Sequence, residues 1–326
     1  MTAVTHSAFS VSNNDQAVSV RPSSRWVDAV VIGAGPAGAS CATWLARLGF
    51  SVEVFDADSA VGGLCRHNPF RDDWNVSLPG MTGPQVADNF AASLSQAGVP
   101  VHVSCPISRV RPIDGGFQIE GPALDAPVYG RHVVVATGVR ARGLKDMSGA
   151  EYPSLSNVLV GPGQAVVDTV FTGRSVAVLG GGDNAFENAL YAYDHGAANV
   201  HIFARTVRAQ AQFRNKFPEK QVHVGPYQVN PEQGQVNGQS FDLIMVFYGW
   251  EPCAPFADAL GLTRTEQGFI ATDSRTAQTS FPGVYAVGEV AQRQHPCVVT
   301  AMADGVAAAK AIQGKLEAVT KGMSLA

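Results

Sequence analysis

Two strand–turn–helix segments share one glycine pattern, the first turning at Gly33 and the second 147 residues later at Gly180. They predict an α/β fold with two Rossmann-like dinucleotide-binding domains, each a three-layer arrangement built on βαβ units. The length of 326 residues agrees, since it corresponds to about two domains of ~150 residues. Hydrophobic residues make up 46% of the chain and charged residues 15%, which excludes a largely disordered chain and allows two buried sheets.

The first repeat is predicted to be strand, helix and strand. An apolar run over 28–32 predicts a buried parallel strand, the segment 36–49 predicts a helix that ends on Gly49, and 51–56 predicts a second strand. Between the first strand and the helix, the chain has Gly-Ala-Gly-Pro-Ala-Gly, and Asp56 follows Gly33 by 23 residues. This combination is the dinucleotide-binding fingerprint.

Each residue of this fingerprint has a physical role. Gly33 makes the tight turn, Gly35 lets the backbone approach a pyrophosphate, and Gly38 lets helix and strand pack closely. The pyrophosphate would lie against the unpaired N–H groups of the helix N-terminus, with Pro36 and Ala37 among the residues that contact it. Asp56 would accept hydrogen bonds from the ribose hydroxyls of adenosine.

The second repeat has the same order, with a strand over 175–179, a helix over 183–195 and a strand over 199–203. Its turn has the form G-x-G-x-x-A, and its predicted nucleotide-binding residues are Gly180, Gly182, Asp183, Asn184 and Ala185. After the second strand, Arg205 and Arg208 lie where an acidic residue would select NAD, and this favours NADP(H). The alternative is that both arginines form, with Arg214, a solvated basic edge.

Further apolar runs over 132–138 and 243–249 each end on glycine and close one copy of the repeat. A last strand is predicted over 283–289, followed by a helix from about 299 to 316. Residues 1–25 lack periodicity and the apolar segment of a signal peptide, and are predicted to be a flexible tail.

The composition excludes several classes of partner. A net charge of −4 without a long basic run argues against nucleic acid, and no uncharged apolar stretch reaches the ~18 residues that a membrane helix needs. The five cysteines lie at least 24 residues apart, so the sequence has no CxxC pair and no metal-ligand spacing. Scattered cysteines indicate a reducing compartment and predict a cytoplasmic protein.

The chain resembles the thioredoxin-reductase-like group of flavoenzymes, which have two dinucleotide-binding domains and belong to the pyridine nucleotide-disulfide oxidoreductases. The resemblance covers almost the whole chain after Trp26 and rests, in the family's order, on Gly33–Gly38, Gly62-Gly63, Asn75 with Pro79-Gly80, Ala136–Gly138, Gly180–Glu187, Tyr248–Trp250, Gly288-Glu289 and Ala303–Gly305. It implies FAD in a discontinuous domain of residues 26–141 and 251–326, an NAD(P)H-binding domain over 142–250, and usually a homodimer.

The resemblance also implies which residues contact FAD. Besides the first glycine turn and Asp56, these are Gly62, Gly63, Leu64, Asn75, Ala136, Thr137, Gly138, Gly288, Glu289, Cys297 and Val298. Asn75 would form a hydrogen bond near the isoalloxazine, and Glu289 would bind the ribityl chain. The N-terminus of the last helix would face the flavin N1/O2 edge, although this chain has Pro296-Cys297-Val298 where the family usually has Arg-Gln-Ala.

Thioredoxin reductases carry a CxxC pair shortly before the second nucleotide-binding fold, and the matching stretch here, residues 158–165, has no cysteine. Since electron transfer to thioredoxin needs such a dithiol, the chain is predicted not to reduce thioredoxin by this route. Near the flavin, Cys65, His67, His295 and Cys297 are candidate catalytic residues for thiol or proton chemistry. The alternative is that the cysteines are ordinary apolar residues and the histidines hydrogen-bonded or exposed ones. Trp74 and Trp250 are expected to pack in the core, with packing on a cofactor as the alternative.

Three functions are compatible with these observations. The first is an FAD-dependent oxidoreductase that passes electrons from NADPH directly to ferredoxin, flavodoxin, a quinone or a small molecule. In the second, the flavin is kept while the second domain is empty or holds another nucleotide, even a second FAD. The third is a small-molecule dithiol oxidase in which Cys65 takes part.

Overall fold

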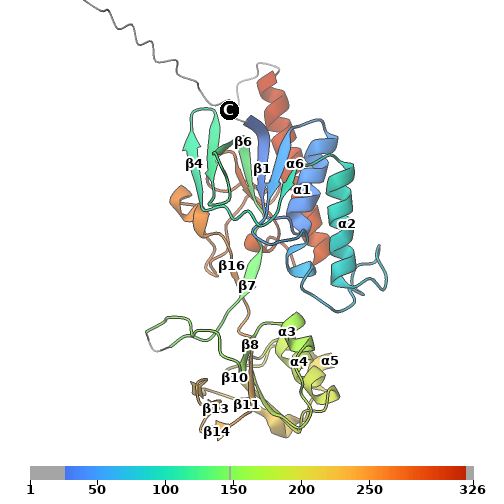
Figure 1. Ribbon diagram of the computed structural model, residues 1–326, viewed down its shortest axis with the longest axis vertical. Coiled ribbons are helices and arrows are strands. Elements are labelled where there is room, and N and C mark those ends of the chain that lie inside the picture. The colour runs from blue at the N-terminus through green and yellow to red at the C-terminus, as the bar shows by residue number, and fades with distance from the viewer. Residues whose placement is uncertain (1–25, 147, 321–326) are drawn as a thin grey trace, which may run out of the picture.

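The computed structural model describes residues 26–146 and 148–320, so the tail predicted over 1–25 lies outside the described residues. Figure 1 shows two lobes joined by two short strands, β7 (Val139–Ala141) and β16 (Trp250–Pro252). These strands pair antiparallel, Ala141 opposite Trp250, so the chain enters and leaves the second lobe through one two-stranded connection.

The upper lobe in Figure 1 is built on a seven-stranded sheet. Its strands are β1 (Trp26–Ile32), β2 (Val52–Phe55), β3 (Val101–His102), β4 (Arg109–Ile113), β5 (Gly116–Glu120), β6 (Val128–Val135) and β17 (Val284–Ala286). The order is β3-β2-β1-β6-β5-β4. The first half of β6 pairs antiparallel with β5 and its second half pairs parallel with β17, so the C-terminal part of the chain completes this sheet.

Three helices cover one face of this sheet: α1 (Pro36–Arg47), α2 (Gly83–Gln96) and α6 (Val298–Thr320). Alternate side chains of the central strands point to opposite faces of the sheet, so each face has its own hydrophobic core. Ala29 and Val31 pack with the helices, while Val30 and Ile32 pack with the β4–β5 hairpin and the 3₁₀ helix η3 (Pro255–Leu260) on the other face. The result is a three-layer domain.

The lower lobe contains a parallel sheet of β8 (Val158–Val160), β9 (Ser175–Leu179), β10 (Asn199–Ala204), β11 (Val222–Val224) and β15 (Leu243–Val246), in the order β11-β10-β9-β15-β8. The helices α3 (Gln164–Val167), α4 (Asp183–Asp194) and α5 (Ala211–Arg214) lie on one side of it. A small sheet of β12 (Val229–Asn230), β13 (Gln235–Val236) and β14 (Gln239–Ser240) lies on the other. Three further 3₁₀ turns are η1 (Gly63–Cys65), η2 (Glu219–Gln221) and η4 (Gly288–Val290).

The elements predicted for both repeats are present, with ends that differ by a few residues. The first helix ends at Arg47 because Gly49, at φ +89°, lets the Phe50 N–H donate to the carbonyl of Leu45. The last helix extends to Thr320 where a stop near 316 was predicted. Within the described residues, no helix combines the length and the apolarity needed to cross a membrane.

Candidate functional site

The first glycine turn is shaped by contacts that only glycine permits. Gly33 has φ +108°, and a Cβ there would lie 2.3 Å from the carbonyl oxygen of Ala136. A Cβ on Gly38 would lie 1.9 Å from the carbonyl oxygen of Gly33. A Cβ on Gly35, in contrast, would have no heavy atom within 4 Å. The turn is therefore packed on its inner side and open at Gly35, where a pyrophosphate would approach.

Two distant segments meet this turn. The N–H of Gly62 donates to the carbonyl of Ala34 at 3.0 Å, and a Cβ on Gly63 would lie 3.4 Å from the Cα of Gly35. Gly288, at the start of η4, has φ +72° and lies so close to Ala37 that a Cβ would be 2.9 Å from the Ala37 Cβ. The structure thus brings together three of the segments predicted to bind one nucleotide.

Asp56, which directly follows β2, stabilises the first glycine turn through its carboxylate. Its Oδ2 accepts the Ala34 N–H at 2.5 Å, and its Oδ1 accepts the Asp58 N–H at 2.8 Å. Burial raises the pKa of Asp56, while these two N–H donors oppose the rise. An ionised carboxylate has about four lone-pair sites, so capacity for a ribose hydroxyl remains.

Two predicted flavin-binding side chains carry buried polar atoms that have no hydrogen-bond partner among the described residues: Asn75 Nδ2 and Thr137 Oγ1. Asn75 is 2% exposed, and its Oδ1 accepts from the Ser77 hydroxyl at 2.8 Å, which leaves the amide N–H groups free for another acceptor. Buried polar groups are normally paired, so both atoms fit a site completed by a polar ligand such as FAD.

The expectation that Trp74 packs in the core is wrong. Its side chain is 84% exposed, and Val76 on the other side of Asn75 is 90% exposed. The segment is a run of turns, in which the Asn75 N–H donates to the carbonyl of Asp72 at 3.3 Å and the Leu78 N–H donates to that of Asn75 at 2.9 Å. These turns bury Asn75 and leave both of its neighbours exposed.

The second glycine turn repeats the geometry of the first. Gly180 has φ +141°, and a Cβ there would lie 2.4 Å from the carbonyl oxygen of Phe247. A Cβ on Gly182 would again have no heavy atom within 4 Å, and both Gly35 and Gly182 are extended N-cap residues, of α1 and α4. Asn184 and Ala185 lie in the first turn of α4, and the Ala185 N–H donates to the carbonyl of Gly182 at 3.1 Å. A helix N-terminus of this kind favours an anion.

The two predicted arginines are exposed at the end of β10, beside this second turn. The backbone N–H of Arg208 donates to the carbonyl of Gly181 at 2.6 Å, so the 205–209 loop lies against the glycine turn. Asp183 secures the loop further, since its two oxygens accept from the Gln210 backbone N–H at 2.7 Å and side-chain amide at 2.8 Å.

Two tyrosines that the sequence did not indicate as site residues lie beside Arg205. The hydroxyl of Tyr227 donates to that of Tyr248 at 3.2 Å. Burial raises the pKa of both tyrosines, and Arg205 opposes the rise in each. Tyr227 follows β11 and Tyr248 follows β15, and a pairing of residues from two turns has no local sequence signal.

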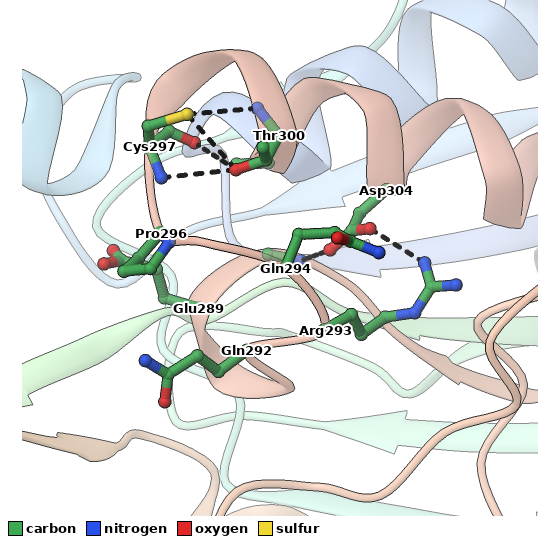
Figure 2. A pocket seen from close by; sticks show the side chains of 10 residues that line it. Glu289, Gln292, Arg293, Gln294, Pro296, Cys297, Thr300 and Asp304 are labelled. Atoms are coloured by element: carbon green, nitrogen blue, oxygen red, sulfur yellow. Dashed lines mark hydrogen bonds and ion pairs between the residues drawn. The ribbon is translucent and has the colours of Figure 1, made fainter.

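Figure 2 shows the turn before α6, where Cys297 and Thr300 bond reciprocally. The Cys297 N–H donates to Thr300 Oγ1 at 3.2 Å, and the Thr300 N–H donates to Cys297 Sγ at 3.5 Å. This arrangement is that of a capping box with sulfur as one acceptor. Glu289 lines the same small cavity, and burial raises its pKa. Val298, the first helical residue, packs against the core.

The other candidate catalytic residues are placed less favourably for thiol or proton-transfer chemistry. Cys65 donates its thiol hydrogen to the carbonyl of Gly83 at 3.3 Å, and burial raises the Cys65 pKa to about 11. His67 is exposed and pairs with Asp58 at 3.2 Å. His295 is exposed, and its carbonyl accepts the Thr300 hydroxyl. Leu64 is 40% exposed, beside Cys65 in η1.

The sheets and the two glycine turns define a fold of two dinucleotide-binding-type domains. The model of the pyridine nucleotide-disulphide oxidoreductase family matches residues 27–305, and the chain belongs to this family. It is an oxidoreductase of the thioredoxin-reductase-like type.

Named relatives fall into more than one activity. The ferredoxin–NADP reductase of Acidovorax sp. (strain JS42) is 28% identical over 297 residues, covering 82% of this chain and 83% of the relative. The thioredoxin reductase of Bacillus subtilis (strain 168) is 24% identical, covering 89% and 95%. The crystal structure of Lactococcus lactis thioredoxin reductase superposes with a TM-score of 0.72 at 25% identity, covering 88% of this chain and 98% of that one.

Proposed function

We propose that the protein binds FAD at the first glycine turn and NADPH at the second, and passes electrons from NADPH through FAD directly to an acceptor outside the chain. The observation that carries this proposal is the pair of equivalent turns. Gly35 and Gly182 are both open where a phosphate would approach, on turns that are otherwise packed against backbone. The unpaired Asn75 and Thr137 atoms support a ligand with polar ring edges at the first turn.

Bound FAD would supply the redox chemistry, taking a hydride from the nicotinamide and releasing electrons to the acceptor. The residues of this chain would bind FAD and NADPH and orient them. The N–H groups at the start of α1 would hold the pyrophosphate, and Asp56 would hold the adenosine ribose. The N-terminus of α6 would place its positive dipole end toward the flavin and favour a reduced, anionic ring.

Arg205 and Arg208 support NADPH over NADH. Neither residue is an acid, and both are exposed beside the second turn. A guanidinium attracts the 2′-phosphate that an acidic residue would repel. The Tyr227–Tyr248 pair beside Arg205 adds hydroxyl groups at the same end of the sheet.

Direct transfer to an external acceptor is supported by the absence of a CxxC pair from the sequence. It is supported further by Cys65, whose pKa of about 11 keeps the thiol protonated near neutral pH, unlike the thiolate that dithiol chemistry uses. A ferredoxin–NADP reductase among the relatives favours a small redox protein as the acceptor, with a quinone or a small molecule as the alternatives.

The test is cofactor analysis of the purified protein, followed by anaerobic reduction of its flavin in a stopped-flow instrument. We expect one FAD per chain and faster bleaching with NADPH than with NADH. An FAD content well above one per chain would support a second flavin in the second domain instead. A bound flavin that millimolar NADPH fails to bleach would overturn the NADPH part of the proposal.

We also propose a homodimer in the cytoplasm. The resemblance to the thioredoxin-reductase-like group supports the dimer, and the five free cysteines support a reducing compartment. Light scattering after size-exclusion chromatography tests the dimer, and a monomer mass would contradict it.

A further inference from the structure

A buried ion pair lies directly behind the predicted flavin site. The Arg293 Nη1 donates to Asp304 Oδ1 at 2.8 Å, with only 7% and 8% of the two side chains exposed. Figure 2 shows the two side chains turned toward each other, Arg293 from the loop after η4 and Asp304 from α6. Buried ion pairs cost desolvation and persist when further hydrogen bonds complete them.

Further hydrogen bonds from this pair reach other segments of the domain, while the buried Arg293 Nε has no partner among the described residues. The second oxygen of Asp304 accepts the N–H of Gly288 at 3.2 Å. The Arg293 Nη2 donates to the carbonyl of Asp273 at 3.3 Å and to the carbonyl of Ser274. One guanidinium and one carboxylate therefore connect η4, the helix α6 and the 273–274 loop.

The connected backbone is the part that faces the first glycine turn. A Cβ on Gly305, next to Asp304, would lie 2.3 Å from the carbonyl oxygen of Ala37, and Gly288 contacts Ala37 as described above. Glu289, which follows Gly288, lines the same cavity of about 10 Å³ as Arg293 and Asp304. Hence the ion pair fixes the position of η4 and α6 relative to α1, and with it the position of the Glu289 carboxylate.

We infer that Arg293 is a positioning residue for FAD: acting through Asp304 and Gly288, it holds Glu289 and the N-terminus of α6 where the cofactor binds. This role rests on the proposed function, because it needs FAD at the first turn. In this role Arg293 does not touch the cofactor. Its effect should therefore appear in FAD retention and in the environment of the bound flavin.

The experiment measures the rate of FAD release from holoprotein on dilution, by flavin fluorescence, together with visible circular dichroism and the urea midpoint at saturating FAD. We expect Arg293→Met to release FAD at least tenfold faster, with an altered flavin dichroism. Arg264→Met is the matched control, because it removes an Arg–Asp pair with Asp258 whose side chains are 32% and 66% exposed. It should release FAD at the wild-type rate.

The double variant Arg293→Met/Asp304→Asn separates positioning from simple stability. It removes both buried charges, so the urea midpoint should recover relative to Arg293→Met, while FAD release stays fast because the link to the 273–274 loop is still missing. If FAD retention recovers together with the midpoint, the role is structural only and the inference is wrong.

Should Arg293→Met fail to fold, FAD release from Arg293→Lys tests the inference instead. Lysine keeps the charge beside Asp304 but lacks the planar fork that reaches two carbonyls, so FAD release should be at least threefold faster. Wild-type release from either variant overturns the inference while leaving the proposed function intact. A wild-type chain that binds no FAD would overturn the proposed function itself.

Discussion

The two open glycines allow the cofactor assignment to be tested without disturbing the fold. Gly35 and Gly182 both have extended backbone, and a Cβ on either would have no heavy atom within 4 Å. Gly35→Ala and Gly182→Ala should therefore fold like the wild type. The new methyl group of each would occupy the space that the corresponding pyrophosphate needs.

The magnitude follows from the contacts that are lost. Replacing glycine by alanine at an allowed backbone conformation changes stability by about 0.4–1 kcal/mol, so the urea unfolding free energy of FAD-stripped Gly35→Ala should stay within about 1 kcal/mol of wild type. A hydrogen bond to a charged group contributes about 1.5–3 kcal/mol. Losing one N–H to phosphate contact should thus weaken FAD binding about ten- to hundredfold, since about 1.4 kcal/mol is tenfold.

The assay is titration of each stripped variant with FAD, followed by quenching of flavin fluorescence, and titration of each reconstituted variant with NADPH. Gly35→Ala should lose FAD affinity, whereas Gly182→Ala should lose only NADPH affinity. Gly33→Ala is the contrasting variant: its Cβ would lie 2.3 Å from a carbonyl oxygen at φ +108°, so it should unfold at markedly lower urea. Wild-type FAD affinity in Gly35→Ala would show that the pyrophosphate does not lie at Gly35, and a loss of stability as large as that of Gly33→Ala would show that the space at Gly35 is not open.

Three further predictions concern single side chains. Burial lowers the pKa of His132 to about 4 from an ordinary 6.5, so on acidification the unfolded chain binds this proton before the folded chain does. The free energy of unfolding is therefore unaffected by this group above pH 6.5 and falls between pH 6.5 and pH 4, by up to about 3 kcal/mol. Urea unfolding at pH 7 and pH 4.5 should show this loss reduced in His132→Phe, and an equal loss in both proteins would contradict it. Arg205→Gln should raise the KM for NADPH about tenfold and leave the KM for NADH unchanged, since it removes the guanidinium charge that attracts the 2′-phosphate. Equal effects on both nucleotides would count against this role. Cys65→Ser should turn over at the wild-type rate, because a hydroxyl can still donate to the Gly83 carbonyl; loss of turnover would revive a thiol mechanism.

Local patterns predicted the repeated part of the fold. The two βαβ units were predictable because strand, glycine turn and helix follow one another within about 30 residues. The helix α2 went unpredicted although its start carries a readable signal: the N–H of Thr82 donates to Gln85 Oε1 at 2.9 Å, as in a capping box. The β4–β5 hairpin also has a turn signal, Asp114-Gly115.

The site was predictable only in part, because several of its features join residues far apart in the chain. The glycine turns and Asp56 follow from sequence spacing, and Asn75 follows from the family resemblance. The connection between β7 and β16 and the hydrogen bond from Tyr227 to Tyr248 depend on how separate loops meet. The outward position of Trp74 depends on the turns of the 72–78 loop, which no periodic pattern in the sequence indicates.

The central claim is that electrons pass from NADPH to FAD held at the Gly33–Gly38 turn. Its most direct test is an anaerobic titration of the purified protein with NADPH, with the visible spectrum recorded at each addition. We expect one bound FAD per chain, whose absorption band bleaches with stoichiometric NADPH and returns when an acceptor is added. A protein that purifies without flavin and does not bind added FAD, or a bound flavin that NADPH leaves oxidised, would contradict it.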